Sequence, residues 1–314
     1  MFDYPLLEVL LAVERERNFE RTALNLGFSK SYISQRLRLL EERLGGVVVC
    51  RDTVRTTHFG NTLCRHLENV QLMEQEFLAE NTHLFSAVHS QPVTIKVGVC
   101  DDSLASWFKT VISTLSSKSN RYFLDLVIRD SATTVQDMID GRIHCALSSS
   151  NSPIPGFDSF YVGEHQYRAT ASPDFISKYL PHGVTCEALS RAPAMRSAED
   201  ETLLQNWMID VLGAFRTAPV NVLPSVHGIL NMCLDGKVWA MTSCLLSRKH
   251  LQSGALVELV PSSSLASGLH WHINKFTAHT LHGLTEAVLE AAQCLSPGKD
   301  RSAVQHAITK SAAE

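Results

Sequence analysis

The sequence predicts an α + α/β protein in which a small helical domain and one long helix precede a larger α/β domain. Apolar residues recur at helical spacing over residues 1–45, a heptad pattern follows over 61–91, and strand-like segments alternate with helical ones from Val93 onward. The chain has 314 residues, of which 45% are hydrophobic and 19% are charged. This length suits about two domains with buried cores, and the composition excludes disorder as the dominant state.

Charge and cysteine content restrict the classes of function. The 28 Lys and Arg nearly balance the 32 Asp and Glu, so binding to a nucleic acid requires a local basic patch. The eight cysteines form no CxxC pair, and we expect them to be reduced and structural in a cytoplasmic protein. The apolar run near the amino terminus is short and lacks a basic start, so we expect no signal peptide and no membrane span.

Residues 1–46 are predicted to form three short helices. Asn18 is expected to cap the second helix, over 20–26, which ends at Gly27; Ser29 caps the third, and Gly45 stops it. The apolar face of the first helix consists of Leu6, Leu7, Leu10, Leu11 and Val13, and that of the third of Ile33, Leu37, Leu40 and Leu44. The polar turn that follows, between short apolar and Thr-rich runs over 47–57, is typical of two small strands that form a wing.

The third helix has a polar outer side, which a helix needs in order to read base edges in the major groove of DNA. Residues 29–55 carry six basic and three acidic side chains, a local net charge of +3. Arg51 and Arg55 on the wing are therefore expected to reach the DNA backbone or the minor groove. The alternative is an amphipathic surface helix with a solvated charged face. The side chains that point away from the apolar face are Ser31, Tyr32, Gln35 and Arg38.

Residues 61–91 are predicted to form a long helix with a heptad seam, which Pro92 ends. The seam has two interpretations: the helix packs on its own domain, or two such helices form a dimer interface. Its positions, alternately four and three residues apart, are Leu63, Leu67, Val70, Glu74, Phe77, Asn81, Leu84 and Val88. Glu74 and Asn81 are its polar members and would fix the register of a dimer at some cost in stability.

The remaining chain alternates between strands and helices, which predicts parallel α/β units. The expected strands lie at 93–100, 122–128, 144–150, 157–163, 167–172 and 269–273. The expected helices lie at 104–115, 133–141, 198–212, 226–235 and 279–295.

The segment 18–60 resembles the winged helix-turn-helix of LysR-type transcriptional regulators. The matching features, in order, are Phe19 before an Arg and Ala pair, Ser29 opening the recognition helix, Ile33-Ser34 within it, Leu40-Glu41 with Leu44-Gly45, Arg51 on the wing and Thr57-x-x-Gly60. The departures are Thr22 in place of Ala, Ser31 in place of Pro, and 48–50 in place of Leu-Phe. The resemblance implies that residues 1–60 bind double-stranded promoter DNA. The residues expected to do so are Ser29, Lys30, Ser31, Tyr32, Ser34, Gln35, Arg38, Arg51 and Arg55.

Three later segments, 102–107, 178–185 and 269–272, resemble the ArgP/LysG branch of this family. Members of that branch respond to arginine or lysine and control genes such as a basic amino-acid exporter. The resemblance implies an effector domain like that of periplasmic binding proteins, with a cleft between two α/β subdomains. Subdomain I would comprise 92–163 and 269–296 and subdomain II 164–268, followed by a mobile tail over 297–314. No cofactor is implied beyond a small effector, L-lysine or L-arginine.

The effector is expected to meet residues that follow the first two strands of this domain. Main-chain N–H groups at a helix start favour a carboxylate, and an Asp beside them could hold an ammonium group. The alternative for these positions is ordinary N-capping. His227 replaces an acidic residue of the branch and Ser243-Cys244 replaces a Pro, which leaves a different small acid or amino acid open as effector. The expected contacts are Cys100, Asp101, Asp102, Ser103, Asp130, Ser131 and His227.

Other sites carry less weight. We interpret Cys100 as a small residue packed at a strand end, the alternative being a thiol whose pKa the helix start lowers. His270 and His272 share one side of a strand, but no third ligand accompanies them, so we interpret them as structural and predict no metal site. No catalytic motif follows a strand. Two other classes of protein use the same α/β scaffold. An enzyme would show turnover independent of DNA, and a solute-binding protein would need an export signal, which we do not expect here.

The prediction is therefore a cytoplasmic DNA-binding regulator and not an enzyme. It would dimerise through 61–91, because two recognition helices read two half-sites, and form tetramers through its effector domains. The effector would change DNA bending or contact with RNA polymerase, with no membrane partner.

Overall fold

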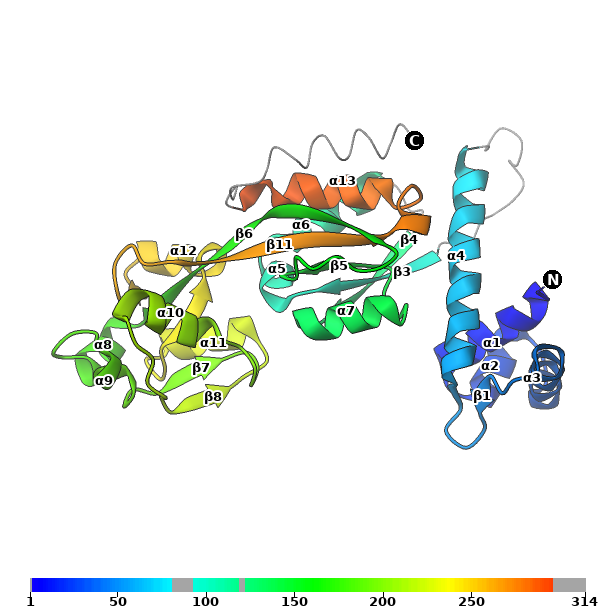
Figure 1. Cartoon of the computed structure of the whole chain (residues 1–314), viewed down its shortest axis with the longest axis horizontal. Coiled ribbons are helices and arrows are strands. Elements are labelled where there is room, and N and C mark those ends of the chain that lie inside the picture. The colour runs from blue at the N-terminus through cyan, green and yellow to red at the C-terminus, as the bar shows by residue number, and fades with distance from the viewer. Residues whose placement is uncertain (1, 81–92, 119–121, 296–314) are drawn as a thin grey trace.

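The computed structural model describes residues 2–80, 93–118 and 122–295, arranged as an elongated molecule (Figure 1). The N-terminal helices lie at one end, the long helix α4 beside them, and the α/β domain extends to the other end. Within these ranges, no helix combines the length and the hydrophobicity that crossing a membrane requires.

The N-terminal domain has the predicted three helices and wing. Asn18 caps the second helix by accepting hydrogen bonds from the N–H groups of Glu20 and Arg21, and Ser29 caps the third by accepting from Tyr32 N. The buried Thr22 donates its hydroxyl hydrogen to Asn18 O at 2.8 Å, which satisfies the polar group where the family usually has Ala. The elements are α1 (Tyr4–Glu16), α2 (Phe19–Leu26), α3 (Lys30–Leu44), β1 (Val49–Cys50) and β2 (Arg55–Thr56).

The predicted Thr57-x-x-Gly60 pattern joins the wing to α4 (His58–Glu80). Thr57 Oγ1 accepts a hydrogen bond from Gly60 N at 3.0 Å and donates one to Val47 O at 2.8 Å. A Cβ atom at Gly60 would lie 2.1 Å from Val48 O, so only glycine permits this approach of helix and wing. The motif is thus a packing requirement of the junction.

The helix α4 begins three residues before its predicted start. The first residues of its heptad seam are buried, whereas Phe77, further along the seam, is exposed. Leu63 and Leu67 are buried in the core of the N-terminal domain. Leu72, outside the seam, is buried against the α/β domain. Phe77 is 56% exposed. The seam positions Asn81, Leu84 and Val88, like the rest of the segment 81–91, lie outside the described residues.

The described part of the α/β domain is built on one seven-stranded sheet in the order β10-β6-β11-β5-β3-β4, with β9 also paired to β6. β3 pairs in parallel with β4 and β5, as predicted, whereas β11, β9 and β10 pair antiparallel. Parallel α/β units therefore account for only part of the sheet. The strands are β3 (Val93–Val99), β4 (Tyr122–Ile128), β5 (Cys145–Ser148), β6 (Phe157–Ala171), β9 (Ala240–Ser243), β10 (Val257–Glu258) and β11 (Leu265–Asn274).

Helices cover both faces of this sheet, and a small second sheet stands beside it (Figure 1). α6 and α13 lie on one face and α7 on the other. The second sheet pairs β7 (Ala194–Arg196) with β8 (Val220–Val222) in parallel. The helices are α5 (Asp101–Ala105), α6 (Phe108–Lys118), α7 (Ser131–Ile139), α8 (Pro173–Tyr179), α9 (Cys186–Leu189), α10 (Leu203–Leu212), α11 (Val226–Leu234), α12 (Cys244–Gln252) and α13 (His282–Ala291), with short 3₁₀ turns η1 (Lys275–Thr277) and η2 (Ala292–Cys294).

Separate hydrophobic cores lie in two halves of the α/β domain. We name residues 93–163 and 269–295 the first lobe, whose largest cluster contains Trp271. Residues 164–268 are the second lobe, with Trp207 and Trp239 in its core. The long strands β6 and β11 run through both lobes and connect them. The exact subdomain boundaries remain predictions.

Several local predictions needed correction. The helix expected over 104–115 is two helices, α5 and α6, separated near Trp107, whose indole is buried in the core. The strands expected at 157–163 and 167–172 are one strand, β6, because Gly163 with φ +135° lets the strand continue through an irregularity of its pairing with β11. The sequence also gave no prediction for β7–β10, α8, α9 or α12.

Candidate functional site

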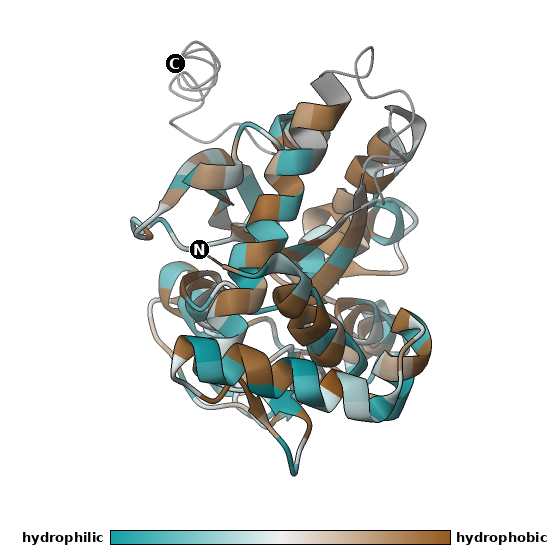
Figure 2. Cartoon of the chain, turned by 90° about the vertical axis from the view of Figure 1, so that its right-hand side faces the viewer, coloured by the Kyte–Doolittle hydropathy of each residue, from teal (hydrophilic) through white to brown (hydrophobic). Residues whose placement is uncertain are grey.

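The outer face of α3 is the first candidate site. Ser29, Ser31, Gln35 and Arg38 are exposed, whereas Ile33, Leu37 and Leu40 are buried. Figure 2, which views the molecule from the end that carries the N-terminal helices, shows hydrophilic and hydrophobic residues alternating along the helices there. A shallow surface groove on α3 is lined by Tyr32, Gln35, Arg36, Arg38, Leu39 and Glu42. The predicted polar face is therefore presented to solvent, as insertion into a groove of DNA requires.

Some basic side chains of this region are engaged within the domain. Lys30 Nζ lies 2.9 Å from Glu20 Oε1, and the Arg36 guanidinium bonds to Tyr32 Oη at 2.5 Å. The half-buried Tyr32 also stacks on Phe28, with ring centroids 4.4 Å apart. Ser34 is half-buried. Gln35 and Arg38 thus combine exposure with freedom from the ion pairs found among the described residues, and they remain the strongest predictions for base contact.

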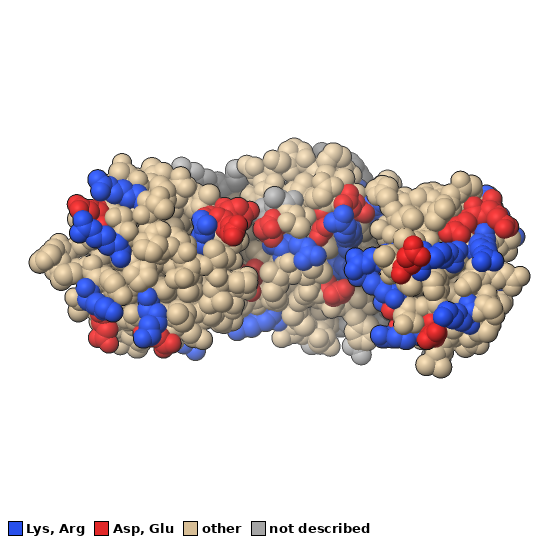
Figure 3. All heavy atoms as spheres, turned by 90° about the horizontal axis from the view of Figure 1, so that it is seen from below, with Lys and Arg blue, Asp and Glu red and all other residues tan. Residues whose placement is uncertain are grey.

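The two wing arginines differ. Arg51 donates to Glu41 Oε2 at 2.8 Å and lies over the Phe19 ring, so it fastens the wing to α2 and α3. Arg55 is exposed on β2. Figure 3 shows basic and acidic side chains interleaved on this end of the molecule, so no uniformly basic surface faces the viewer. The local excess of positive charge is modest, and DNA affinity would depend on where the basic groups lie.

A cleft in the α/β domain is the second candidate site. Its cavity volume is about 20 Å³, and residues of both lobes line it: Asp102, Tyr167, Ser197, Glu201, Leu203, Val226, Ile229, Leu230, Met241, Thr242, Ser243 and Leu246. Two carboxylates and no Lys or Arg stand among these lining residues. Such a lining favours a cationic ligand with an aliphatic part.

Asp102 is the predicted effector residue that lines this cleft. Tyr167 Oη donates a hydrogen bond to Asp102 Oδ2 at 3.0 Å, which joins the first lobe to the second. Burial raises the pKa of Asp102 to about 6, although this hydrogen bond acts in the opposite direction. A carboxyl group with this pKa is poised to ionise when a cation binds beside it.

Glu201, which the sequence analysis did not single out, supplies the second carboxylate. Its Oε2 accepts hydrogen bonds from Ser197 N at 2.7 Å and Ser197 Oγ at 2.9 Å. Burial raises the pKa of Glu201 as well. The acidic run 199–201 before α10 was a visible signal, but nothing in the sequence indicated that its last member faces Asp102 across a cleft.

Asp101 and Ser103 flank Asp102 without lining the cleft. Asp101 Oδ2 accepts a hydrogen bond from Val226 N at 2.9 Å, so it meets the first residue of α11 in the other lobe. Ser103 is fully buried, and its Oγ lies 3.0 Å from His165 Nε2. Burial lowers the pKa of His165 to about 4, so this imidazole is neutral at physiological pH. These contacts hold α5 against the strand that connects the lobes.

Cys100 corresponds to the packed interpretation. Its Sγ donates to Ser103 Oγ at 3.0 Å, and burial raises the pKa of the thiol to about 11. Burial of the thiol favours the packed interpretation over a thiol activated by the helix start, because desolvation disfavours the thiolate.

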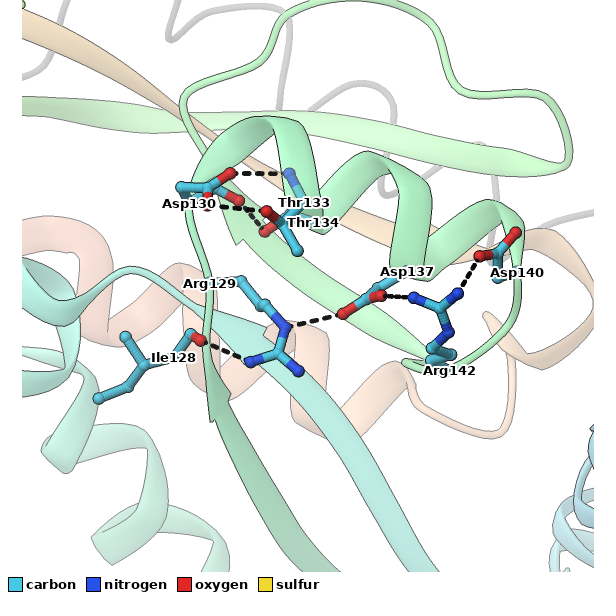
Figure 4. Close-up of polar contacts among 8 residues, drawn as sticks. All are labelled: Ile128, Arg129, Asp130, Thr133, Thr134, Asp137, Asp140 and Arg142. Carbon is cyan, nitrogen blue, oxygen red and sulfur yellow. Dashed lines mark hydrogen bonds and ion pairs between the residues drawn. The ribbon is translucent and has the colours of Figure 1, made fainter. Parts of the chain in front are cut away.

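Asp130, which follows β4, is not among the residues that line the cleft, and Figure 4 shows the contacts that it makes instead. Asp130 is exposed and caps α7, its carboxylate accepting from Thr133 N and Thr133 Oγ1, both at 2.7 Å. The ordinary N-cap is thus what the structure presents here. The neighbouring Asp137 is buried between Arg129 and Arg142. The side chain of Ser131 lies outside the described residues.

His227 is exposed on α11 and is absent from the cleft lining, although its neighbour Val226 contributes. His272 of β11 is fully buried between Ser148 and Ser159, whose Oγ atoms lie 3.1 and 2.7 Å from its ring nitrogens, whereas the buried Nδ1 of His270 has no hydrogen-bond partner among the described residues. In the described ranges, no group of three or more His, Cys, Asp or Glu side chains is arranged to hold a metal ion.

A third surface lies on α4. Met73 and Phe77 are 46% and 56% exposed, and with Val70, Glu74 and Leu78 they line an open apolar groove. Apolar exposure of this kind on a long helix is typical of a helix-helix contact.

Two family models match the chain. One, described as the bacterial regulatory helix-turn-helix protein of the LysR family, matches residues 5–61, and the other, described as the LysR substrate binding domain, matches 91–293. The first match includes α3, and the second includes the residues that line the cleft.

Known proteins are similar along almost the whole chain. An HTH-type transcriptional regulator ArgP of Pseudomonas fluorescens is 34% identical over 95% of this chain and 99% of its own length, and an ArgP of Vibrio cholerae is 30% identical over 94% and 98%. The crystal structure of ArgP from Mycobacterium tuberculosis has a TM-score of 0.79 at 28% identity, covering 94% of this chain and 99% of that one. The chain therefore belongs to the LysR family of DNA-binding transcriptional regulators.

Proposed function

We propose that this regulator responds to a basic amino acid, L-lysine or L-arginine, bound in the cleft between its lobes. The effector would control genes for amino-acid export or metabolism. The observation that carries the proposal is the cleft lining, in which Asp102 and Glu201 stand among aliphatic residues with no lining Lys or Arg. Burial raises the pKa of both carboxyl groups, so ionising both is unfavourable while the cleft holds no ligand. A cation bound beside them would offset this cost.

Relatives support the proposal. The similar proteins named ArgP resemble the chain from end to end, and the structurally similar full-length LysG of Corynebacterium glutamicum is described with the effector Arg bound. Asp101, Cys100 and Ser103 would then position α5 behind the ligand. Asp130, Ser131 and His227 stay weaker predictions for contact, since the described lining does not include them.

Binding to the full-length protein tests the effector directly. Thermal unfolding is followed with L-lysine, L-arginine and two matched ligands that lack the side-chain charge, L-norleucine and L-citrulline. A ligand present at 100 times its dissociation constant stabilises the folded state by about 2.7 kcal/mol. We expect stabilisation by L-lysine or L-arginine and little by the neutral analogues. Equal shifts with all four, or none, would instead support the second candidate, a regulator of another small acid or amino acid.

The DNA-binding unit would act as a dimer. We propose that the groove formed by Val70, Met73, Glu74, Phe77 and Leu78 on α4 covers the same groove of a second copy, because operators with two half-sites match a protein two-fold axis. Tetramers would form through the α/β domains. Ligand binding would shift the arrangement of subunits and so change DNA bending or contact with RNA polymerase, in the cytoplasm where promoter DNA is accessible.

A further inference from the structure

The cleft contains polar groups to which the proposed function assigns no role, and the hydroxyl of Ser243 is one of them. Ser243 is the last residue of β9 and the N-cap residue of α12, but its side chain makes no capping hydrogen bond. It is 2% exposed, and its Oγ has no hydrogen-bond partner in the described structure although the residue lines the cleft. A buried hydroxyl without a partner is costly, and it is most simply explained as a group that meets a ligand.

Each carboxylate of the cleft accepts hydrogen bonds from the protein through one of its two oxygen atoms. Asp102 uses Oδ2 for Tyr167, and Glu201 uses Oε2 for Ser197. The structure records no partner among the described residues for Asp102 Oδ1 or Glu201 Oε1. The cleft therefore offers hydrogen-bond acceptors from two lobes, with Asp102 in the first and Glu201 in the second.

Among the described residues, no basic side chain forms an ion pair with Asp102 or Glu201. Arg196, on β7, lowers the pKa of Glu201 through its charge, but it forms no ion pair with that carboxylate and is not a lining residue. Apart from hydroxyl-bearing residues, the other side chains that line the cleft are apolar and include Leu203, Ile229 and Leu246. Two negative ends with an aliphatic middle match a ligand with two cationic nitrogens joined by methylene groups.

We propose that Glu201 and Ser243 form the second-lobe half of the ligand site, in which Glu201 binds a second cationic nitrogen of the ligand opposite the one that Asp102 binds. The inference rests on the proposed cleft function and deepens it, because it names Glu201 as the residue that distinguishes ligands with two cationic nitrogens from those with one. The Ser243 hydroxyl hydrogen-bonds to the same ligand. A ligand that contacts both lobes in this way favours the arrangement of the lobes that admits it over the others.

The test measures ligand preference with isothermal titration calorimetry on the full-length protein. The ligands are two pairs that differ in one cationic nitrogen: L-lysine with L-norleucine, and 1,5-diaminopentane with pentylamine. We expect the wild type to prefer the member with two nitrogens by about tenfold or more, as one charge-assisted hydrogen bond provides. Glu201→Gln should reduce this preference to below about threefold.

Matched variants separate specificity from folding. Glu199→Gln makes the same chemical change at an exposed position two residues away and should keep the wild-type preference. Glu201→Asp retains the charge and should retain a preference even if affinity falls, and it replaces Glu201→Gln should that variant not fold. Ser243→Ala should weaken binding of both members of a pair while leaving their ratio unchanged.

The outcomes distinguish this inference from the proposed function. A wild-type preference that survives in Glu201→Gln overturns the role of Glu201, even though lysine binds. If lysine does not bind but 1,5-diaminopentane is preferred over pentylamine in a Glu201-dependent way, the amino-acid effector is wrong and the subsite stands. If the wild type prefers neither ligand with two nitrogens, the subsite is overturned.

Discussion

The carboxylate of Asp101 in one lobe accepts a hydrogen bond from the main-chain N–H of Val226 in the other, at 2.9 Å. Val226 is the first residue of α11, and the N–H groups of the first turn of a helix have no partner inside it. Ser225 caps the same end by accepting a hydrogen bond from Gly228 N. The negative charge of Asp101 also lies at the positive end of the helix dipole. Together with the bond from Tyr167 to Asp102, this contact links α5 to the second lobe on the rim of the cleft.

Asp101→Ala should loosen this link. We expect the amide of Val226 to exchange its hydrogen about tenfold faster, because a hydrogen bond to a charged group contributes roughly 1.5–3 kcal/mol. Hydrogen exchange followed by NMR or mass spectrometry over 225–228 measures it. Asp130→Ala is the matched control, because Asp130 caps α7 within the first lobe. Unchanged exchange at Val226 in Asp101→Ala would show that the contact does not hold the lobes together.

Gln35→Ala and Arg38→Ala should each weaken binding to the operator by roughly 1–3 kcal/mol, the range for one base contact in the major groove. Both side chains are exposed on α3, so the fold and its melting temperature should be unchanged. Fluorescence anisotropy with specific and scrambled DNA measures the loss. Arg43→Ala removes a charge from the same helix, where Arg43 pairs with Asp3, and serves as control. Wild-type affinity in both test variants would disprove the assignment of α3 as the reading helix.

Ligand affinity should fall in acid. Burial raises the pKa of Asp102 from 3.8 to about 6, and a cationic ligand requires the ionised form. Below about pH 6 the apparent dissociation constant should therefore rise roughly tenfold per pH unit, until the other groups of the cleft also titrate. The carboxyl group that shares the cleft is Glu201, whose pKa burial also raises, with the charge of Arg196 nearby; burial raises the pKa of Tyr167, so its hydroxyl stays protonated over this range. Calorimetry of L-lysine binding between pH 5 and 8 provides the profile.

The same pKa predicts how stability depends on pH. Because the folded state favours the protonated form of Asp102, its contribution to stability is fully present below the ordinary pKa of 3.8 and is lost as pH rises through about 6. Asp102→Asn should remove that dependence, so its free energy of unfolding relative to wild type should rise between pH 4 and 6 and level off above. Urea unfolding of both proteins across this range measures the difference. Parallel curves would contradict the raised pKa.

Phe77→Glu should disrupt dimerisation. The substitution places a charge in the exposed apolar groove of α4, where a second copy would desolvate it. Analytical ultracentrifugation should show a shift toward smaller species at micromolar concentration, and operator binding should weaken accordingly. Phe123→Glu is a control, because Phe123 is equally apolar and 64% exposed but lies on β4. An unchanged sedimentation profile in Phe77→Glu would rule out this groove as the dimer seam.

Much of the N-terminal domain could be predicted because its signals are local. Asn18, Ser29, Gly27 and Gly45 are caps and stops that act through neighbouring backbone groups, and each is found at the expected helix end. The strands of the first lobe were likewise visible as short apolar runs. The burial pattern of α4 was not visible, since Leu63 is buried in the N-terminal core and Leu72, outside the seam, is buried against the α/β domain.

The second lobe and the cleft were harder to predict. Short elements such as β7 and α9 have too few residues to show a period, and antiparallel pairing of β6 with β9 joins residues more than 70 positions apart. Asp130 illustrates the same difficulty for a site. From the sequence, an Asp at the end of a strand is equally consistent with a ligand contact and with a helix cap, and only the tertiary structure identified Asp130 as the N-cap of α7.

By itself the sequence determined the N-terminal helices, the exposed polar face of α3 and the family, because helix caps, apolar periodicity and the Thr57 to Gly60 junction depend on residues close together in the chain. Only the tertiary structure decided which acids share the cleft. Asp102, Glu201 and Ser243 come from segments separated by about a hundred residues and by forty, and their meeting follows from how β6 and β11 connect the lobes. Electrostatic coupling and desolvation depend on distances in space, which no pattern along the chain records.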